Sequence, residues 1–220
     1  LAIVDILERC GLPKGVLNVI LPPQSGSAIS KVLHDPRVKN LSFTGSTQVG
    51  KILLKEAADQ VIRCSMELGG NAPFVVFEDA DIKAMAHALA MGSTYNTGQD
   101  CTAATRIYVH SSKFDVAVKE LTSVMSSIKY GDPQDPSSDI GPLISAEHRT
   151  RVHLFVENAK SAGATIHTGG FIPDTDGFYY PPTLITEAKQ NSDAVQKEIF
   201  GPVVVVLPFS TEYEAISLSN

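Results

Sequence analysis

Short apolar runs alternate with amphipathic stretches over the first 68 residues, which is the pattern of a parallel α/β unit. The expected strands are 17–21, 40–43 and 63–68. The expected helices are 1–10, 28–34 and 46–58. The last helix would carry one apolar face, formed by Val49, Ile52, Leu53 and Ala57. Two glycines follow at once, and we place a domain boundary near Gly69.

The alternation continues beyond Gly69 with longer elements. The expected strands are 74–77, 105–110, 165–168 and 203–208. The expected helices are 81–95, 113–128 and 145–162. The helix at 113–128 places its apolar residues at steps of four and three, at Phe114, Val118, Leu121, Met125 and Ile128. The pattern predicts an α/β protein with two domains, residues 1–68 and residues 69–220.

Composition and charge narrow the class of protein. The chain has 220 residues, is 43% hydrophobic and has a formal net charge of -6 with no basic stripe, so nucleic acid is not an expected partner. No apolar run approaches the roughly 20 residues of a membrane span, and the sequence shows no charged start followed by an apolar region and a small-residue cleavage site. We expect a cytoplasmic protein. The sequence starts at Leu1 without Met and stops at Asn220 in a predicted helix, as an internal fragment would.

The first candidate site is the turn between the strand at 40–43 and the helix at 46–58, which contains Gly45 and Ser46. Free N–H groups and the positive dipole at a helix N-terminus attract an anion, and a glycine lets the backbone approach it closely. The turn therefore favours phosphate binding. It lacks the G-x-G-x-x-G spacing, and taken alone an ordinary turn capped by Ser46 is the better interpretation.

The second candidate is Glu67, near the end of a strand that we expect to be buried and just before Gly69 and Gly70. Burial raises the pKa of a carboxyl group toward the range of a general base, and the glycines leave room for a ligand. The alternative is a carboxylate at a strand end that forms an ion pair.

The third candidate is Cys101, in the polar loop between the helix at 81–95 and the strand at 105–110. A loop cysteine near backbone donors can react as the thiolate. Cys10 and Cys64 lie in apolar contexts and are expected in the core. No Cys/His cluster of zinc type is present, so no metal is expected.

The fourth candidate is residues 196–202, which include Glu198 and Phe200 before the last strong strand. Taken alone, they indicate surface charge and core packing. In combination, residues 43–46, 67–70, 98–101 and 198–202 resemble the aldehyde dehydrogenase superfamily in order and near its spacing. Residues 95–104 are similar to γ-aminobutyraldehyde dehydrogenases, whereas residues 66–74 are similar to succinate-semialdehyde dehydrogenases.

The resemblance implies part of a Rossmann-type NAD(P)-binding domain in residues 1–68 and a truncated catalytic domain in residues 69–220. It implies that Cys101 attacks the aldehyde carbon and that Glu67 activates the water that hydrolyses the resulting thioester. It further implies that NAD or NADP, with NAD favoured, is bound by Gly45, Ser46, Val49, Gly50, Leu68, Glu198 and Phe200. A small aldehyde is the expected partner, and the full-length protein is expected to be a homo-oligomer.

The sequence also departs from the family's pattern. Asn71 stands where the family often has lysine, and Ala103 stands where some succinate-semialdehyde enzymes have a second, redox-active cysteine. Asp100 could contact a substrate ammonium group, or it could simply cap the next turn. We expect oxidation of a short ω-amino or ω-carboxy aldehyde. The alternatives are a succinate-semialdehyde dehydrogenase specifically, a non-catalytic fragment of the same fold, and a thiol hydrolase. The 220-residue chain alone is expected to have no useful turnover.

Overall fold

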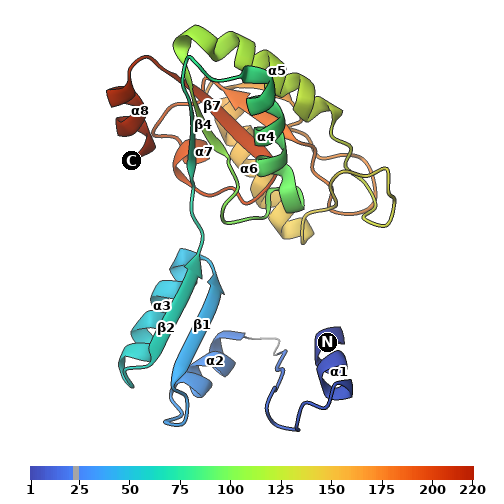
Figure 1. Cartoon of the computed structure of the whole chain (residues 1–220), viewed down its shortest axis with the longest axis vertical. Coiled ribbons are helices and arrows are strands. Elements are labelled where there is room, and N and C mark those ends of the chain that lie inside the picture. The colour runs from blue at the N-terminus through green and yellow to red at the C-terminus, as the bar shows by residue number, and fades with distance from the viewer. Residues whose placement is uncertain (22–24) are drawn as a thin grey trace. The chain divides into compact units, whose positions relative to one another are not determined.

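A computed structural model of the chain describes residues 1–21 and 25–220. The described chain divides into two compact units, Leu1–Leu68 and Gly69–Asn220. Both units are built from strands and covering helices, so the α/β fold is confirmed (Figure 1). Among the described residues, no helix is both long enough and apolar enough to cross a bilayer.

The first unit is built around the parallel pair of β1 (Asn40–Gly45) and β2 (Arg63–Leu68), joined by α3 (Thr47–Ala58). The helices α1 (Ala2–Arg9) and α2 (Ser25–Leu33) precede the strands. A small apolar core forms where α2 and α3 meet β1 and β2, from Leu33, Leu41, Leu53, Ala57 and Ile62.

Two expectations for this unit are wrong. Residues 17–21 form no strand, because no neighbouring strand pairs with their backbone groups, and their apolar side chains are exposed. Helix α3 turns Gly50, Leu53 and Ala57 inward, whereas Val49 is 42% exposed and Ile52 is 52% exposed. Gly50 faces the strands in place of a larger residue because it lies against the Leu68 side chain.

The sheet of the second unit has the strand order β3-β4-β7-β6-β5. Its strands are β3 (Pro73–Val76), β4 (Arg106–His110), β5 (Thr165–Thr168), β6 (Thr183–Thr186) and β7 (Val203–Phe209). Strands β3, β4, β7 and β6 run parallel, and β5 pairs antiparallel to β6. The last strand of the sequence therefore lies inside the sheet, between β4 and β6.

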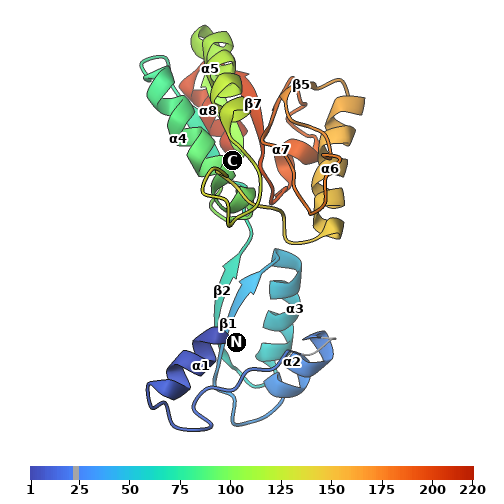
Figure 2. The same ribbon diagram turned by 90° about the vertical axis from the view of Figure 1, so that its right-hand side faces the viewer.

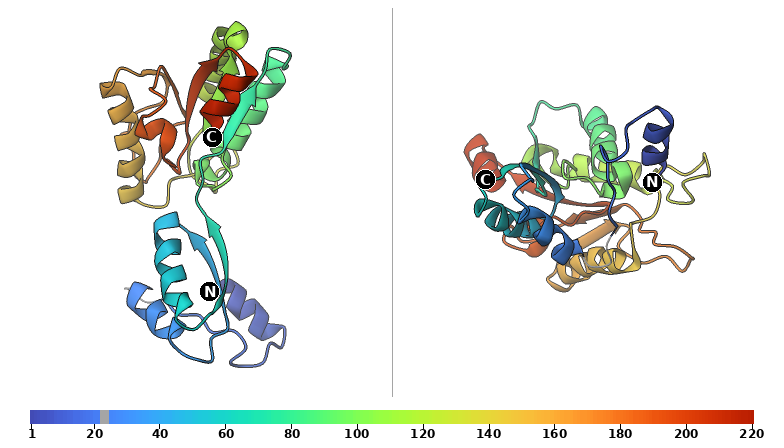
Figure 3. Two further views of the ribbon diagram at one scale, coloured as in Figure 1. Left: turned by 90° about the vertical axis from the view of Figure 1, so that its left-hand side faces the viewer. Right: turned by 90° about the horizontal axis from the view of Figure 1, so that it is seen from below.

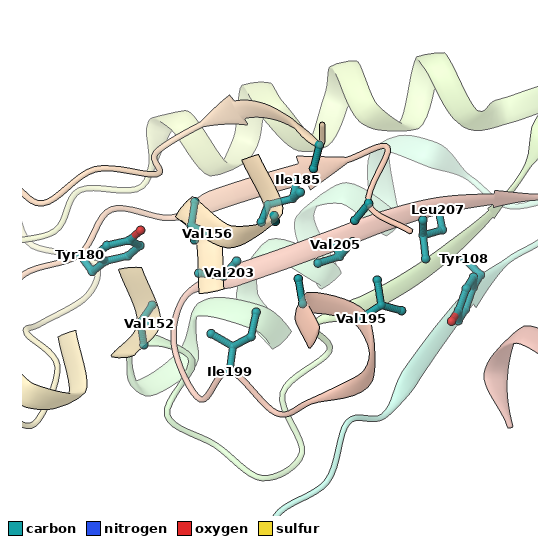
Figure 4. Packing of buried hydrophobic residues seen from close by; sticks show 14 of the residues in the cluster. Tyr108, Val152, Val156, Tyr180, Ile185, Val195, Ile199, Val203, Val205 and Leu207 are labelled. Carbon is teal, nitrogen blue, oxygen red and sulfur yellow. The ribbon is translucent and has the colours of Figure 1, made fainter. Parts of the chain in front are cut away.

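Helices cover both faces of this sheet. One face carries α4 (Ile82–Thr94) and α5 (Phe114–Ser127), and the other carries α6 (Ala146–Ser161) and α7 (Asp193–Gln196) (Figures 2 and 3). A final helix, α8 (Glu212–Ser219), follows β7. Side chains of the central strand alternate between the faces. Val204 and Val206 join the cluster under α4 and α5, and the Val203, Val205 and Leu207 side chains join the cluster under α6 and α7 (Figure 4).

Polar caps set where the helices begin. Asp81 accepts hydrogen bonds from the Lys83 and Ala84 N–H groups at the start of α4, at 3.0 and 3.1 Å. Ser145 accepts one from the His148 N–H at the start of α6, at 3.1 Å. Each cap satisfies N–H groups that have no partner inside the helix. They set the first residues of α4 and α6, which precede and follow the Cys101 loop in the chain.

Candidate active site

Cys101 lies in a turn after α4, and the backbone before it has an unusual conformation. Asn96, Thr97 and Gly98 have φ angles of 49°, 60° and 68°. A left-handed residue other than glycine costs roughly 1–2 kcal/mol, so the loop persists only where its surroundings hold it. The polar loop expected around Cys101 is present. Its three successive left-handed residues were not predicted.

Side-chain hydrogen bonds hold this strained loop. The Thr97 hydroxyl donates to the Gly141 carbonyl at 3.0 Å, and the Gln99 side-chain oxygen accepts from the Ile144 N–H at 2.9 Å. Across the turn, the Asn96 amide donates to the Gln99 carbonyl at 2.9 Å. Gln99 thus anchors the loop on both sides, a role that the sequence alone did not reveal.

Asp100 and Cys101 are next to each other at the end of the loop. The Asp100 carboxylate accepts from the Thr102 N–H and hydroxyl, both at 2.8 Å. These bonds, led by the one from the Thr102 N–H, hold the pKa of Asp100 below its usual value. Asp100 therefore caps the following turn, as the simpler interpretation expects. The Cys101 side chain is exposed and free of disulfide bonding.

The Glu198 carboxylate lies on the backbone that enters the second unit. Its Oε1 accepts from the Gly70 N–H at 3.3 Å. A Cβ atom on Gly69 would overlap Glu198 Oε2 and come within 2.8 Å of its Cδ. A Cβ on Gly70 would be 3.7 Å from the Cys101 carbonyl oxygen. The structure thus brings Gly69, Gly70, Glu198 and the Cys101 loop together.

Phe200 follows Glu198 with a φ angle of 60°, again a left-handed residue that is not glycine. The His148 Nε2 bonds the Phe200 carbonyl at 2.6 Å, and the two rings lie 6.0 Å apart in an edge-to-face arrangement. The Arg151 guanidinium donates to the carbonyls of Glu198 and Ile199. Sequence reasoning missed His148 and Arg151, since an amphipathic helix with polar residues gives no signal of their partners.

The residues proposed to bind phosphate lie together at the start of α3 in the first unit. Ser46 is the N-cap of α3, and its hydroxyl accepts from the Val49 N–H at 3.3 Å. A Cβ on Gly45 would lie 2.6 Å from the Phe43 ring, and one on Gly50 would lie 2.6 Å from Leu68 Cδ2. Glycine at both positions allows the turn to be tight and α3 to pack closely on β2. The cap itself is what an ordinary strand-to-helix turn would also show.

Glu67 is next to the last residue of β2 and is opposite Thr44 in the parallel register. The expectation that this strand is buried is wrong, because exposed and half-buried side chains alternate along β2 and Glu67 is exposed. Within the described residues of its unit, Glu67 has no ion-pair partner. Glu67 belongs to the first unit and Cys101 to the second, so their joint action stays a prediction.

The remaining cysteines differ in their surroundings. Cys10 is exposed at the end of α1, so its predicted place in the core is wrong. None of the residues of this helix is buried. The apolar residues around Cys10 in the sequence therefore do not place it in a core. Cys64 is half-buried and packs against the small core of the first unit. In the part of the chain that the structure describes, no three His, Cys, Asp or Glu residues gather to hold a metal ion.

Asn71 joins three elements of the second unit. Its amide donates to the Val195 carbonyl at 2.6 Å, and its side-chain oxygen accepts from the Thr105 hydroxyl at 3.2 Å. Arg106 donates to its backbone carbonyl at 3.0 Å. At this position, where the family often has lysine, the side chain is a structural link between β3, α7 and β4.

Comparison with known proteins places this chain and its fold in one family. The sequence model of the aldehyde dehydrogenase family matches residues 1–220. The chain therefore belongs to the aldehyde dehydrogenase family, as its motifs predict.

Individual relatives agree with this assignment. The chain is 42% identical over 214 residues to a succinate-semialdehyde dehydrogenase of Paenarthrobacter nicotinovorans, which covers 97% of the chain and 48% of that protein. It is 41% identical over 221 residues to the NADP(+)-named succinate-semialdehyde dehydrogenase 1 of Schizosaccharomyces pombe, covering 100% of the chain and 44% of that protein. The chain thus spans about half the length of these curated relatives.

A solved structure is similar over the whole chain. The crystal structure of betaine aldehyde dehydrogenase from Staphylococcus aureus, in complex with NAD+, superimposes with a TM-score of 0.93 at 37% identity. The match covers 100% of this chain and 44% of that one. The fold of both units is therefore that of an aldehyde dehydrogenase.

Proposed function

We propose that the protein oxidises an aldehyde to the carboxylic acid with NAD(P), with Cys101 as the nucleophile and Glu67 as the base. Residues 1–68 would contribute to the cofactor domain and residues 69–220 to the catalytic domain. The observation that carries the proposal is the exposed Cys101, held in a strained loop beside Gly70 and the Glu198 carboxylate. Conformational strain that surrounding contacts enforce is concentrated at functional sites.

The chemistry follows from the side chains. The Cys101 thiolate would attack the aldehyde carbon, and the Cys101 backbone N–H would stabilise the oxyanion that forms. When bound, the nicotinamide supplies the hydride acceptor that converts the adduct to a thioester. Glu67 would then deprotonate a water molecule, which hydrolyses the thioester and releases the acid. Glu67 is exposed, so its carboxylate is accessible to water in this unit.

The described residues fit a dinucleotide. The α3 N-terminus presents backbone N–H groups beside Gly45, which has no side chain to hinder a pyrophosphate. Ser46 would bind the same group, with Val49 and Gly50 in the helix turn beneath it, and Leu68 would contact the carboxamide through its backbone. Glu198 would bind the ribose hydroxyl groups, and Phe200 would pack beside the nicotinamide ring. The NADP(+)-named relative and the NAD+-bound neighbour support both cofactors, and we favour NAD.

The substrate is proposed to be a short aldehyde with a charged group at its far end. The names of the relatives support an ω-carboxy aldehyde such as succinate semialdehyde. An ω-amino aldehyde would instead use the Asp100 carboxylate, an acid that is ionised at neutral pH and whose pKa is lowered further by its hydrogen bonds from Thr102. Asp100→Asn separates the two. A fall in kcat/KM for aminobutyraldehyde relative to succinate semialdehyde would support the ammonium contact, and an unchanged ratio would exclude it.

The direct test is NADH formation on addition of aldehyde, using the protein expressed from its complete gene. Cys101→Ser should abolish NADH formation, because the thiolate is lost. Cys10→Ser is the matched control, since Cys10 is also exposed but lies at the end of α1. Equal activity of both variants would refute the assignment of Cys101.

A second variant tests the base. Glu67→Gln should allow thioester formation but slow its hydrolysis, so the intact protein should gain the mass of the acyl group after reaction. Ester hydrolysis without cofactor, and no NADH with any aldehyde, would indicate a thiol hydrolase. No turnover of either kind would indicate a non-catalytic protein of this fold.

A further inference from the structure

One short segment contacts both loops of the candidate site. Residues 141–151, here called the brace segment, comprise the chain from Gly141 to the start of α6 and its first turns, ending at Arg151. The first residues of the brace segment form hydrogen bonds with the Cys101 loop. Its last residues form hydrogen bonds with the loop that contains Glu198 and Phe200. All three belong to the second unit.

The first end of the brace segment holds the loop of the nucleophile. The Gly141 carbonyl accepts from the Thr97 hydroxyl at 3.0 Å, and the Ile144 N–H donates to the Gln99 side chain at 2.9 Å. These bonds flank Gly98 on both sides of the left-handed turn. They offset the cost of two left-handed residues that are not glycine, and so define where Cys101 lies.

The other end holds the loop that carries Glu198. The Arg151 guanidinium donates to the Glu198 carbonyl at 2.8 Å and to the Ile199 carbonyl at 2.7 Å. His148 Nε2 bonds the next carbonyl, that of Phe200, at 2.6 Å. Three consecutive carbonyls are thus bound from α6 by two side chains that lie one helical turn apart. Their bonds hold the left-handed Phe200 backbone in place.

The guanidinium is itself held in position. It lies 5.1 Å from the centre of the Phe155 ring, one turn further along α6, in a cation–π arrangement. Ser145 caps the helix at its other side, so the positions of His148 and Arg151 are tied to the residues that bind Gln99 and Thr97. The brace segment therefore links the two loops through one rigid helix start.

The two loops also contact each other directly. A Cβ atom on Gly98 would overlap the Gly201 carbonyl, and a Cβ on Gly201 would come within 2.8 Å of the Val152 side chain of α6. A displacement of either loop would therefore meet the other, or α6. The relative position of the nucleophile and of Glu198 depends on the contact between the two loops and on the contact of Gly201 with α6.

We propose that the brace segment is the positioning element of the site, with Gln99 positioning the nucleophile and with His148 and Arg151 positioning Glu198 and Phe200. The inference rests on the proposed function, because it assigns those loops to the nucleophile and the cofactor. The two ends act on different partners, so they are separable by experiment.

The test of one end is Arg151→Met, in the protein expressed from its complete gene. Loss of two charge-assisted hydrogen bonds should weaken NADH binding about tenfold, measured by nicotinamide fluorescence. The rate at which iodoacetamide alkylates Cys101 without cofactor should stay within about twofold, because the bonds at Gln99 remain. Arg151→Lys should restore part of the affinity, since one carbonyl can still be bound.

Arg149→Met is the matched control. Arg149 lies on the same helix and donates to the Gly177 carbonyl at 2.7 Å, away from both loops. It should leave NADH affinity unchanged. Gln99→Leu should show the opposite pattern to Arg151→Met, with an altered alkylation rate and retained NADH affinity.

The outcomes separate this inference from the function on which it rests. Normal NADH binding by Arg151→Met, or equal losses in the Arg149 and Arg151 variants, would overturn the brace segment alone. Equal changes in both readouts for Gln99→Leu and Arg151→Met would also overturn it, since a general loosening of the fold would explain them. Failure of the unsubstituted protein to bind NADH would overturn the proposed function and the inference together.

Discussion

Replacement of Gly98 by alanine would test the contact between the two loops of the site. The new Cβ would overlap the Gly201 carbonyl and lie 2.7 Å from the Pro202 nitrogen. These are backbone atoms, so they cannot swing aside as the end of a side chain can. Gly98 also has a φ angle of 68°, which costs roughly 1–2 kcal/mol for alanine.

Overlap in a packed region costs typically about 1–3 kcal/mol, so the variant should lose roughly 2–5 kcal/mol of unfolding free energy. For a domain of this size the unfolding temperature should fall by at least about 4 °C, measured by circular dichroism. Any folded protein should alkylate Cys101 at a changed rate, because the loop must move to accommodate the methyl group.

Gly92→Ala is the matched control for Gly98→Ala. Gly92 lies inside α4, and its new Cβ would meet only the Ala104 Cβ, at 3.9 Å. This variant should be more stable by about 0.5–1 kcal/mol, because alanine restricts the unfolded chain and favours the helix. If Gly98→Ala were as stable as Gly92→Ala, the close approach of the two loops would be wrong.

Three further predictions concern other parts of the second unit. Gly69→Ala should change the unfolding temperature little, because only the end of the long Glu198 side chain must move, but it should weaken NADH binding measured by fluorescence. Burial, with a smaller contribution from the charge of Glu157, raises the pKa of Tyr180 above its usual 10.0. The folded state thus retains the Tyr180 hydroxyl proton to a higher pH than the unfolded chain does, so the free energy of unfolding falls as the pH rises above 10.0. Tyr180→Phe should make that fall less steep in urea titrations. Val205→Ala, in the fully buried centre of β7, should cost about 1.5–3 kcal/mol in the same titrations, and a cost near zero would contradict the packing of that strand.

The sequence predicted helices and strands best where glycine or polar turn residues mark their ends. The strands 63–68 and 165–168 have the bounds expected, because glycine and polar turns end them. Strand β6 was missed. Its four residues are all buried and include threonine at both ends, so the sequence shows no alternation of apolar and polar residues there. Residues 17–21 have a strand composition, but a strand requires a partner that composition does not supply.

The candidate site was predictable only as a set of motifs. The family and the α/β fold are confirmed, whereas the catalytic and cofactor roles of individual residues stay predictions. The contacts that hold the site join residues far apart in the sequence, as in the bond between Gly70 and Glu198. No local pattern indicates that Arg151 binds the Glu198 carbonyl or that Gly98 lies on Gly201.

The position of β7 between β4 and β6 has a consequence for synthesis of the chain on the ribosome. About 90 residues separate β4 from β7, so at about 5–20 residues per second the β4 edge stays unpaired for roughly 5–20 s. An unpaired strand edge is a template for association with other chains. The nascent second unit thus exposes an unpaired strand edge during this interval, and the Cys101 loop can form its contact with Gly201 only after that residue has been synthesised.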